Sequence, residues 1–211
     1  MPQLLSATEA RILGVLIEKT KTTPDAYPLT VNSLTAGCNQ KTSREPVMSL
    51  SESEIQSTLE ELRSRTLVME SYGASGRVLR YAHNFARVYG VPAASVDLLA
   101  ILILRGPQTA SELRANSERL HRFADVSSVE AFLEELAAKD SGAMVLKLPR
   151  QPGAREQRWT HLLCGMPTTE SISTGSATQP SALVSDLETR VERLELEVAE
   201  LRASLARQAE E

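Results

Sequence analysis

Polar and apolar positions follow two successive patterns between residues 51 and 82. Residues 51–54, Ser-Glu-Ser-Glu, form a capping-box motif, in which a serine hydroxyl and the glutamate three residues later satisfy each other's free backbone N–H groups. The apolar stripe behind this motif consists of Ile55, Leu59 and Leu62, which recur at helical spacing. Residues 66–71 are β-prone, a turn with two glycines follows, and residues 77–82 alternate polar and apolar side chains. The pattern predicts a helix and a β-hairpin, the second half of a winged-helix domain.

The same pattern returns later in the chain. Leu-Glu-Glu-Leu at 59–62 is matched at 133–136, and apolar residues at 13–17 are matched at 99–103. Three further positions recur in the same order, since Pro28, Thr30 and Leu34 correspond to Pro107, Thr109 and Leu113. The spacing between the copies falls from 86 to 79 to 74 residues along the chain, so the first copy carries two insertions. The insertions lie near residues 20–27 and 39–50. Ordered matches of this kind indicate an internal repeat.

The repeat predicts a mainly α-helical protein with small β-hairpins, built from two tandem winged-helix domains and a C-terminal extension. Its parts are a first winged-helix domain at 1–83, a short inter-domain join at 84–91, a second winged-helix domain at 92–164, a flexible linker at 165–180 and a coiled-coil helix at 181–211. The join holds Phe85, Val88 and Tyr89, so we expect the two domains to pack against each other. The linker is rich in serine and threonine, a composition typical of flexible segments.

The C-terminal helix is expected to form a homodimer. Its apolar seam consists of Val184, Leu187, Val191, Leu194, Val198, Leu201 and Leu205, spaced alternately by three and four residues. Valine at the first seam position of a heptad and leucine at the second favour two parallel strands. The alternative is a single amphipathic helix folded back on the body, but such helices usually carry a wider apolar stripe. We therefore expect a parallel coiled-coil dimer.

Composition and charge narrow the class of protein. The 211 residues are 42% hydrophobic but only 4% aromatic, so the cores must consist mainly of aliphatic side chains. Residues 166–211 carry 9 acidic and 4 basic side chains, whereas the preceding residues carry 18 acidic and 19 basic ones. A neutral body with an acidic tail is not typical of a strong general nucleic-acid binder.

The sequence suggests neither secretion nor a membrane span. The N-terminus lacks a basic region followed by an apolar run, and the longest apolar run, residues 98–104, is too short to cross a bilayer. Cys38 and Cys164 show no metal-ligand spacing, which indicates reduced thiols. We expect a cytoplasmic protein with no membrane partner.

Residues that would carry catalysis or hold a cofactor do not cluster in the sequence. It contains no glycine-rich phosphate loop and no nucleophile elbow. The three histidines, His83, His121 and His161, are isolated from one another and from the cysteines. His83 and His161 each follow the returning strand of a copy, where a hydrogen bond to backbone is expected. We expect no enzyme activity, no cofactor and no metal site.

Several segments of the first copy resemble one bacterial family. These segments are Gly-Val-Leu-Ile-Glu-Lys at 14–19, Thr-Thr-Pro-Asp-Ala-Tyr-Pro-Leu at 22–29, Cys-Asn-Gln-Lys at 38–41 and Arg-Glu-Pro-Val at 44–47. They are similar to the YceH family of uncharacterised bacterial cytoplasmic proteins, and the resemblance covers roughly residues 4–164. It implies a tandem winged-helix fold, in agreement with the repeat, but it implies no established activity and no site residues.

Nucleic-acid binding is the usual role of a winged helix, with the third helix in the major groove and the wing on the backbone or minor groove. The basic residues placed for such contacts are Lys41, Arg44, Arg63, Arg65, Arg77 and Arg80 in the first copy and Arg150, Arg155 and Arg158 in the second, with Arg119 and Arg122 before its third helix. Arginine suits phosphate because its planar fork donates two parallel hydrogen bonds. The sequence therefore predicts possible duplex DNA binding through the wings and the basic loop, as in a transcription regulator.

The charge of the predicted third helices favours a partner other than DNA. Outside their apolar stripes they carry more glutamate than arginine or lysine, and carboxylates repel phosphates. Some winged helices bind protein instead, and the accessory subunit of bacterial condensin is similar in plan. The alternative function is therefore a protein-interaction scaffold.

Overall fold

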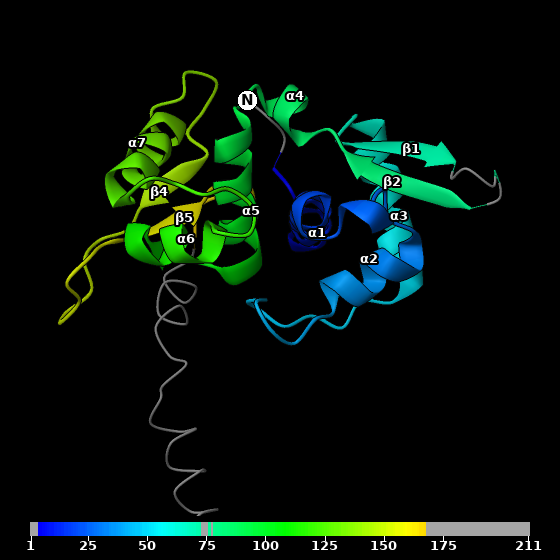
Figure 1. The fold of residues 1–211 in the computed structure, drawn as a ribbon, viewed down its shortest axis with the longest axis horizontal. Helices are drawn as coiled ribbons and strands as arrows, with labels where there is room; N and C mark the ends of the chain where they lie inside the picture. Colours follow the sequence, from blue (N-terminus) through cyan, green and yellow to red (C-terminus); the bar gives the residue numbers. More distant parts are fainter. Residues whose placement is uncertain (1–3, 73–75, 77, 168–211) are drawn as a thin grey trace, which may run out of the picture. The chain divides into compact units, whose positions relative to one another are not determined.

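The computed structural model describes residues 4–72, 76 and 78–167, which lie within one compact unit, Met1–Thr168 (Figure 1). This described part is mainly helical and contains two small antiparallel sheets. The coiled-coil helix predicted at 181–211, its dimer seam and most of the predicted linker lie outside the described residues.

The first half of the unit runs from α1 to β2. Its elements are α1 (Ala7–Thr22), the 3-10 helix η1 (Pro24–Ala26), α2 (Val31–Cys38), α3 (Glu52–Ser64), β1 (Val68–Tyr72) and β2 (Leu79–His83). β1 and β2 form an antiparallel hairpin in which Val68 lies opposite His83. Leu29, between η1 and α2, forms a β-bridge with Tyr81 of β2. The helix and the hairpin predicted between residues 51 and 82 are therefore present.

The second half repeats the order of the first. After the short helix α4 (Phe85–Tyr89), its elements are α5 (Ala93–Arg105), β3 (Gln108–Thr109), α6 (Ala110–Ser117), α7 (Val126–Ala137), β4 (Val145–Lys147) and β5 (Arg158–His161). β5 lies between β3 and β4 in a three-stranded antiparallel sheet, with Val145 opposite His161. β3 thus takes the place beside β5 that Leu29 has beside β2.

Reciprocal side-chain caps fix where several helices begin. Ser6, Ser51 and Thr109 each accept a hydrogen bond from the backbone N–H three residues later, and the glutamate at that position bonds back to the N–H of the cap. The capping box predicted at 51–54 is confirmed. A side-chain cap of this kind typically stabilises a helix by about 1 kcal/mol. These helix starts therefore depend on residues only three positions apart.

One hydrophobic core runs through both halves. α1 and α5 pack side by side and are buried over their central turns (Figure 1). They approach closely at Gly14, where a methyl group would lie 3.0 Å from side-chain carbons of Ile103 and Leu104. A second link joins the halves, because the Leu5 N–H donates to the Leu163 carbonyl at 2.8 Å. The two halves therefore share their packing.

Candidate functional site

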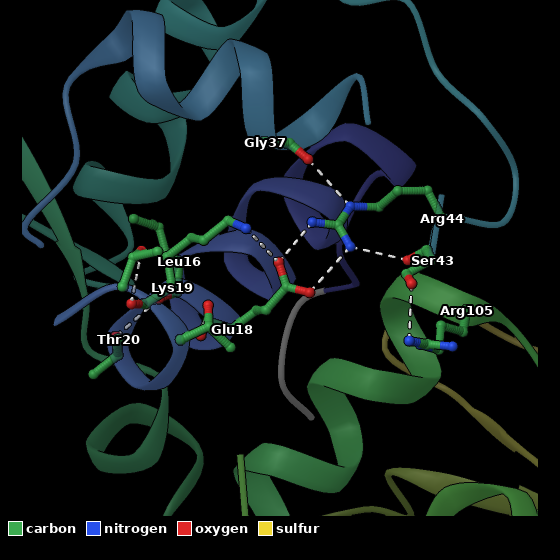
Figure 2. Close-up of polar contacts among 10 residues, drawn as sticks. Leu16, Glu18, Lys19, Thr20, Gly37, Ser43, Arg44 and Arg105 are labelled. Atoms are coloured by element: carbon green, nitrogen blue, oxygen red, sulfur yellow. Dashed lines mark hydrogen bonds and ion pairs between the residues drawn. The ribbon is translucent and has the colours of Figure 1, made fainter. Parts of the chain in front are cut away.

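The loop between α2 and α3, residues 39–50, is predicted to offer Lys41 and Arg44 to a phosphate backbone. Lys41 is exposed, but the Arg44 side chain is buried. Its guanidinium makes a bidentate pair with Glu18 on α1, with N···O distances of 3.2 and 2.7 Å, and it donates to the Gly37 carbonyl at 3.1 Å (Figure 2). A phosphate would reach Arg44 only by displacing Glu18, so the contacts of Arg44 serve the fold.

Arg11 on α1 binds the same helix end as Arg44. It is 1% exposed, and its two terminal nitrogens donate to the carbonyls of Cys38 and Pro46 at 3.0 and 2.5 Å. The last carbonyls of α2 carry the negative end of the helix dipole, which suits two cations. Burial lowers the pKa of Arg11, and the charge of Arg44 adds to this effect. Two buried arginines therefore close the C-terminus of α2.

Glu18 is the carboxylate that balances these arginines. Burial raises the pKa of its carboxyl, but the hydrogen bonds and charge of Arg44 and the Lys19 ammonium at 3.2 Å outweigh burial and hold the pKa below its usual value. Removing one partner of a buried ion pair leaves an uncompensated charge, which typically costs about 3–5 kcal/mol. The pair of Arg44 and Glu18 therefore fixes the loop on α1.

The same loop also contacts the second half of the unit. The Glu45 N–H donates to the Leu104 carbonyl at 2.7 Å, and Arg105 donates to the Ser43 hydroxyl at 2.8 Å (Figure 2). Leu104 and Arg105 belong to the last turn of α5, whose carbonyls lack partners within the helix. We call residues 39–50 the strap, because they bind both α1 and the end of α5.

Arg80 and Arg158 lie at matching places in the two hairpins and make matching contacts. Arg80 donates to the Pro28 carbonyl at 2.8 Å. Arg158 donates to the Pro107 carbonyl at 2.8 Å and to Glu112 at 3.0 Å. Sequence reasoning missed this role, although Pro28 and Pro107 correspond in the repeat and so do the two arginines. Both arginines hold a hairpin against the segment that precedes a second helix.

Arg63 and Arg65, at the end of α3, are paired with carboxylates. Arg63 bonds to Glu70 at 2.9 Å and has 55% of its side chain exposed, whereas Arg65 bonds to Glu9 at 2.7 Å and is largely covered. An exposed pair of this kind contributes at most about 1 kcal/mol, so Arg63 stays accessible to a ligand. Arg77 lies outside the described residues.

Arg150 and Arg155 belong to the loop between β4 and β5, beside a surface cavity of about 410 Å³. The cavity lies between this loop and the first turns of α6 and α7, and its charged lining consists of Glu130, Lys147, Arg150, Arg155 and Glu156. Arg150 donates to the carbonyls of Ala154 and Arg155, which closes the turn of this loop. Three cations and two carboxylates leave the cavity only weakly positive.

The outer faces of the third helices, α3 and α7, are acidic. Their exposed carboxylates are Glu52, Glu54, Glu60 and Glu61 on α3 and Glu134 and Glu135 on α7. Arg63 is the one basic residue of α3, and α7, which is described throughout, holds no basic residue. The charge pattern that the sequence predicts for these helices is therefore present on their surface.

Most of the chain matches a known family. The family described as "Protein of unknown function, DUF480" matches residues 5–154. The chain belongs to the DUF480 family. A UPF0502 protein of Leptothrix cholodnii is 56% identical over 217 residues, which cover 100% of this chain and 96% of that relative. UPF0502 proteins of Acidovorax sp. strain JS42 and Dechloromonas aromatica are 55% and 57% identical, over 98% of this chain in each case and over 93% and 97% of the relatives.

Two half-buried histidines hold matching positions in this DUF480 chain. His83 lies opposite Val68 in the first hairpin, and His161 lies opposite Val145 in the second. In each ring the Nδ1 atom is buried without a hydrogen-bond partner among the described residues, so the expected bond to backbone is absent at this atom. Burial lowers the pKa of both imidazoles to about 4, and the Lys21 ammonium adds to this effect at His83. Both rings are therefore neutral at pH 7.

The described residues of the DUF480 chain bring together few groups with chemical reactivity. No three histidine, cysteine, aspartate or glutamate side chains among them are placed to hold a metal ion. None of the helices described has both the length and the apolar character of a membrane span. Cys38 is a buried free thiol, and burial raises its pKa to about 12, so it is protonated at neutral pH. The surface charges described above are therefore the main features from which a function can be argued.

Proposed function

We propose that this DUF480 protein is a non-enzymatic scaffold that binds other proteins through two winged-helix domains. The order of helix, short strand, two helices and hairpin in each half supports that fold, because Leu29 and β3 supply the short first strand beside the returning strand of the wing. The domains that follow are 1–83 and 92–164, with α4 in the join. The resemblance to the YceH family agrees with this assignment.

The acidic outer faces of α3 and α7 carry the proposal. In a DNA-binding winged helix the third helix enters the major groove, between two lines of phosphates. Four exposed glutamates and one exposed arginine lie on α3, and the exposed charges of α7 are carboxylates. Two like charges about 4 Å apart repel by roughly 1 kcal/mol even in water, so each close approach to a phosphate is unfavourable. A basic surface on a partner protein would be attracted by the same residues.

The contacts of the basic residues support the same conclusion. The predicted DNA contacts that are buried or half-buried and bind carbonyls or carboxylates of their own chain are Arg44, Arg65, Arg80 and Arg158. Those that are exposed are Lys41, Arg63, Arg119, Arg122, Arg150 and Arg155. Lys41 lies on the strap in the first half and Arg150 and Arg155 on the wing of the second, so these exposed cations are divided between the two halves. On α3 the one exposed cation is Arg63, whereas α7 carries none and is preceded by the exposed Arg114, Arg119 and Arg122.

DNA binding through the second wing is the second candidate function. The specific observation in its favour is the cavity beside that wing, where a phosphate would meet Lys147, Arg150 and Arg155. Glu130 and Glu156 line the same cavity and weaken this attraction.

Binding to duplex DNA at two salt concentrations separates the two functions. A fluorescent duplex of random sequence is titrated with the full chain at low and at near-physiological salt, and anisotropy is recorded. The scaffold proposal expects weak binding at low salt and none at about 10 µM protein at the higher salt. Tight binding whose affinity falls with a log–log slope of about −0.9 for each of several contacts would overturn it, above all if Arg150→Ala with Arg155→Ala abolishes the binding.

Photo-cross-linking from α3 tests the scaffold proposal directly. A photoreactive amino acid replaces Glu61 on the exposed face of α3, and a control chain carries it at exposed Arg119 in the second half. The proposal expects a discrete protein adduct with the Glu61 chain, and it expects Glu60→Lys in that chain to reduce the adduct by reversing a neighbouring charge. Adducts to nucleic acid alone, or equal protein adducts from both positions, would contradict the proposal.

We propose that the scaffold is a homodimer with two-fold symmetry. Residues 181–211 lie outside the described residues, so the coiled-coil dimer stays a prediction from the heptad seam. Two joined bodies would double the contacts offered to a two-fold partner and raise the effective affinity without any new type of contact.

A further inference from the structure

The hairpin of the first half has one covered edge and one open edge. β2 pairs with β1 on one side, and Leu29 bonds to Tyr81 of β2 on the other, with N···O distances of 2.8 and 3.0 Å (Figure 1). No described residue forms a β-bridge with the outer edge of β1. Among the described residues β1 is therefore an edge strand.

The register of the hairpin shows which backbone groups lie at this edge. The Asn84 N–H donates to the Leu67 carbonyl at 2.8 Å, so Leu67 and Asn84 occupy the position of a hydrogen-bonded pair, although the Leu67 N–H donates to the Leu62 carbonyl. Such pairs alternate along an antiparallel ladder, which makes Met69 and Ser71 the residues bonded to β2. The backbone N–H and C=O of Glu70 and Tyr72 therefore point outward. Tyr81 lies opposite Glu70, and its N–H and C=O point away from β1 and bond to Leu29, as this alternation requires.

The open edge lacks the protection that the second wing has. Edge strands are usually guarded by shortness, lysine or proline. β4, the corresponding strand of the second wing, has three residues, ends in Lys147 and is followed by Pro149. β1 has five residues without lysine or proline, and it exposes Met69 and Tyr72 to 51% and 72%. Within one chain, the first wing thus presents an unguarded edge and the second a guarded one.

On the face of β1 that lies toward α3, carboxylates outnumber basic side chains. Glu60 of α3 and Glu70 of β1 both act electrostatically on Arg63 and on the Tyr81 hydroxyl, so these groups are gathered in one place. Arg63 bonds to Glu70 at 2.9 Å and leaves one carboxylate in excess. Tyr72 shares this face with Glu70, because alternate residues of a strand point to the same side. The opposite face carries Met69.

We infer that the open edge of β1 receives an extended segment of a partner protein as a third strand, and that this segment alternates basic and apolar residues. Its basic side chains face Glu60, Glu70 and the ring of Tyr72, which attracts a cation. Its apolar side chains lie on the side of Met69. Main-chain hydrogen bonds to Glu70 and Tyr72 provide the affinity, and the alternation provides the specificity. The inference rests on the proposed function as a protein-binding scaffold, and it names the site and the partner class.

The probe is the peptide acetyl-Lys-Val-Arg-Val-Lys-Val-amide, added to the full chain labelled with nitrogen-15. The inference expects chemical-shift changes centred on Met69–Tyr72 and slower hydrogen exchange of the outward N–H groups of Glu70 and Tyr72. A peptide with glutamate in place of the basic residues should bind at least about tenfold more weakly, since it meets the excess carboxylate. Equal binding of both peptides would overturn the assigned partner class.

Two matched changes test the strand pairing itself. Methylation of alternate backbone nitrogens in the probe removes its inward donors and should weaken binding at least about tenfold, because strand addition depends on these bonds. In the protein, Glu70→Pro removes one outward N–H, whereas Glu70→Thr removes the same carboxylate and keeps the N–H, so the proline variant should bind more weakly. The methylated peptide needs no change in the protein and gives an answer even if the proline variant does not fold.

The outcomes separate this inference from the proposed function. Indifference to methylation, or shifts confined to the cavity of the second wing, would overturn strand addition at β1 and leave a protein-binding scaffold in place. Tight, salt-dependent DNA binding in the anisotropy experiment would overturn the scaffold, and this inference with it.

Discussion

Mild acid should destabilise this protein through two half-buried histidines. His83 and His161 occupy corresponding strand ends, and each buries an Nδ1 atom that has no hydrogen-bond partner among the described residues. Burial lowers the pKa of both rings from 6.5 to about 4. Because the folded pKa lies below the unfolded one, the unfolded chain takes up protons first. Stability is therefore unaffected well above pH 6.5 and is lost as the pH falls from 6.5 toward 4.

The size of the effect follows from the two pKa values. At pH 5 an unfolded imidazole is about 1.5 pH units below its pKa of about 6.5, whereas the buried ring is still mostly neutral, so each histidine costs about 2 kcal/mol. Together they remove about 4 kcal/mol, against a total stability of about 5–15 kcal/mol for a typical domain. The steepest dependence, about 2.4 kcal/mol per pH unit, should appear slightly above pH 5, midway between the two pKa values.

Urea unfolding followed by circular dichroism at pH 7, 6 and 5 and constant ionic strength measures this loss. His83→Gln and His161→Gln each remove one titrating ring, so each variant should lose about half as much stability as the natural chain between pH 7 and 5, and the double variant should lose little. The comparison uses the change with pH within each variant, so that any cost of the substitution at pH 7 cancels.

Other groups do not reproduce this pattern. Burial raises the pKa of Asp97, so proton uptake there favours the folded state as the pH falls, which is the opposite sign. The lowered pKa of Glu18 matters only below its unfolded value of about 4.5, outside the measured range. An equal loss of stability in the natural chain and in the double variant would refute the assignment to the histidines.

Three further predictions concern the strap, the packing and the assembly. Arg44→Ala should cost about 3 kcal/mol in urea unfolding at pH 7, because the half-buried Glu18 loses its bidentate partner and keeps only Lys19; a cost below 1 kcal/mol, as for an exposed arginine, would contradict this. Gly37→Ala should cost about 1–3 kcal/mol, because the new methyl would lie 2.7 Å from Cγ1 of Val15, and an unchanged midpoint would count against the packing. In sedimentation at tens of micromolar, the full chain should be a dimer and a chain ending at Pro167 a monomer. Two monomers would exclude the coil as a dimer element, and two dimers would place an interface on the body.

Local signals in the sequence were enough to predict most elements of the described unit. The capping box of Ser51 and Glu54 spans three residues, and the stripe behind it repeats every three or four, so both appear in a short window of sequence. The hairpins are local as well, since each returning strand pairs with the strand just before it. The internal repeat then placed His83 and His161 at corresponding sites without any structure.

The contacts of the arginines could not be predicted in this way. Arg44 and Glu18 are 26 residues apart, and Arg158 and Glu112 are 46 residues apart, so no local pattern connects them. An arginine in a polar loop has the same local sequence whether it faces solvent or a buried carboxylate. The unsatisfied Nδ1 atoms of the histidines escaped prediction for the same reason, because they depend on what covers each strand end. Charge on the outer faces of α3 and α7 was predictable, because the apolar stripe already fixes which side of a helix is exposed.

The strap gives a physical role to the insertion at 39–50 in the first half. It is held on α1 by the buried pair of Arg44 and Glu18, and its Glu45 N–H caps the end of α5 at Leu104. α1 and α5 therefore cannot slide past each other without breaking a buried ion pair or uncapping a helix. Because α3 and α7 pack on these two helices, their acidic faces keep a fixed spacing. Two sites bind one partner more tightly than either alone only when their geometry lets both engage at once, and a strap that fixes this geometry favours a scaffold with two faces.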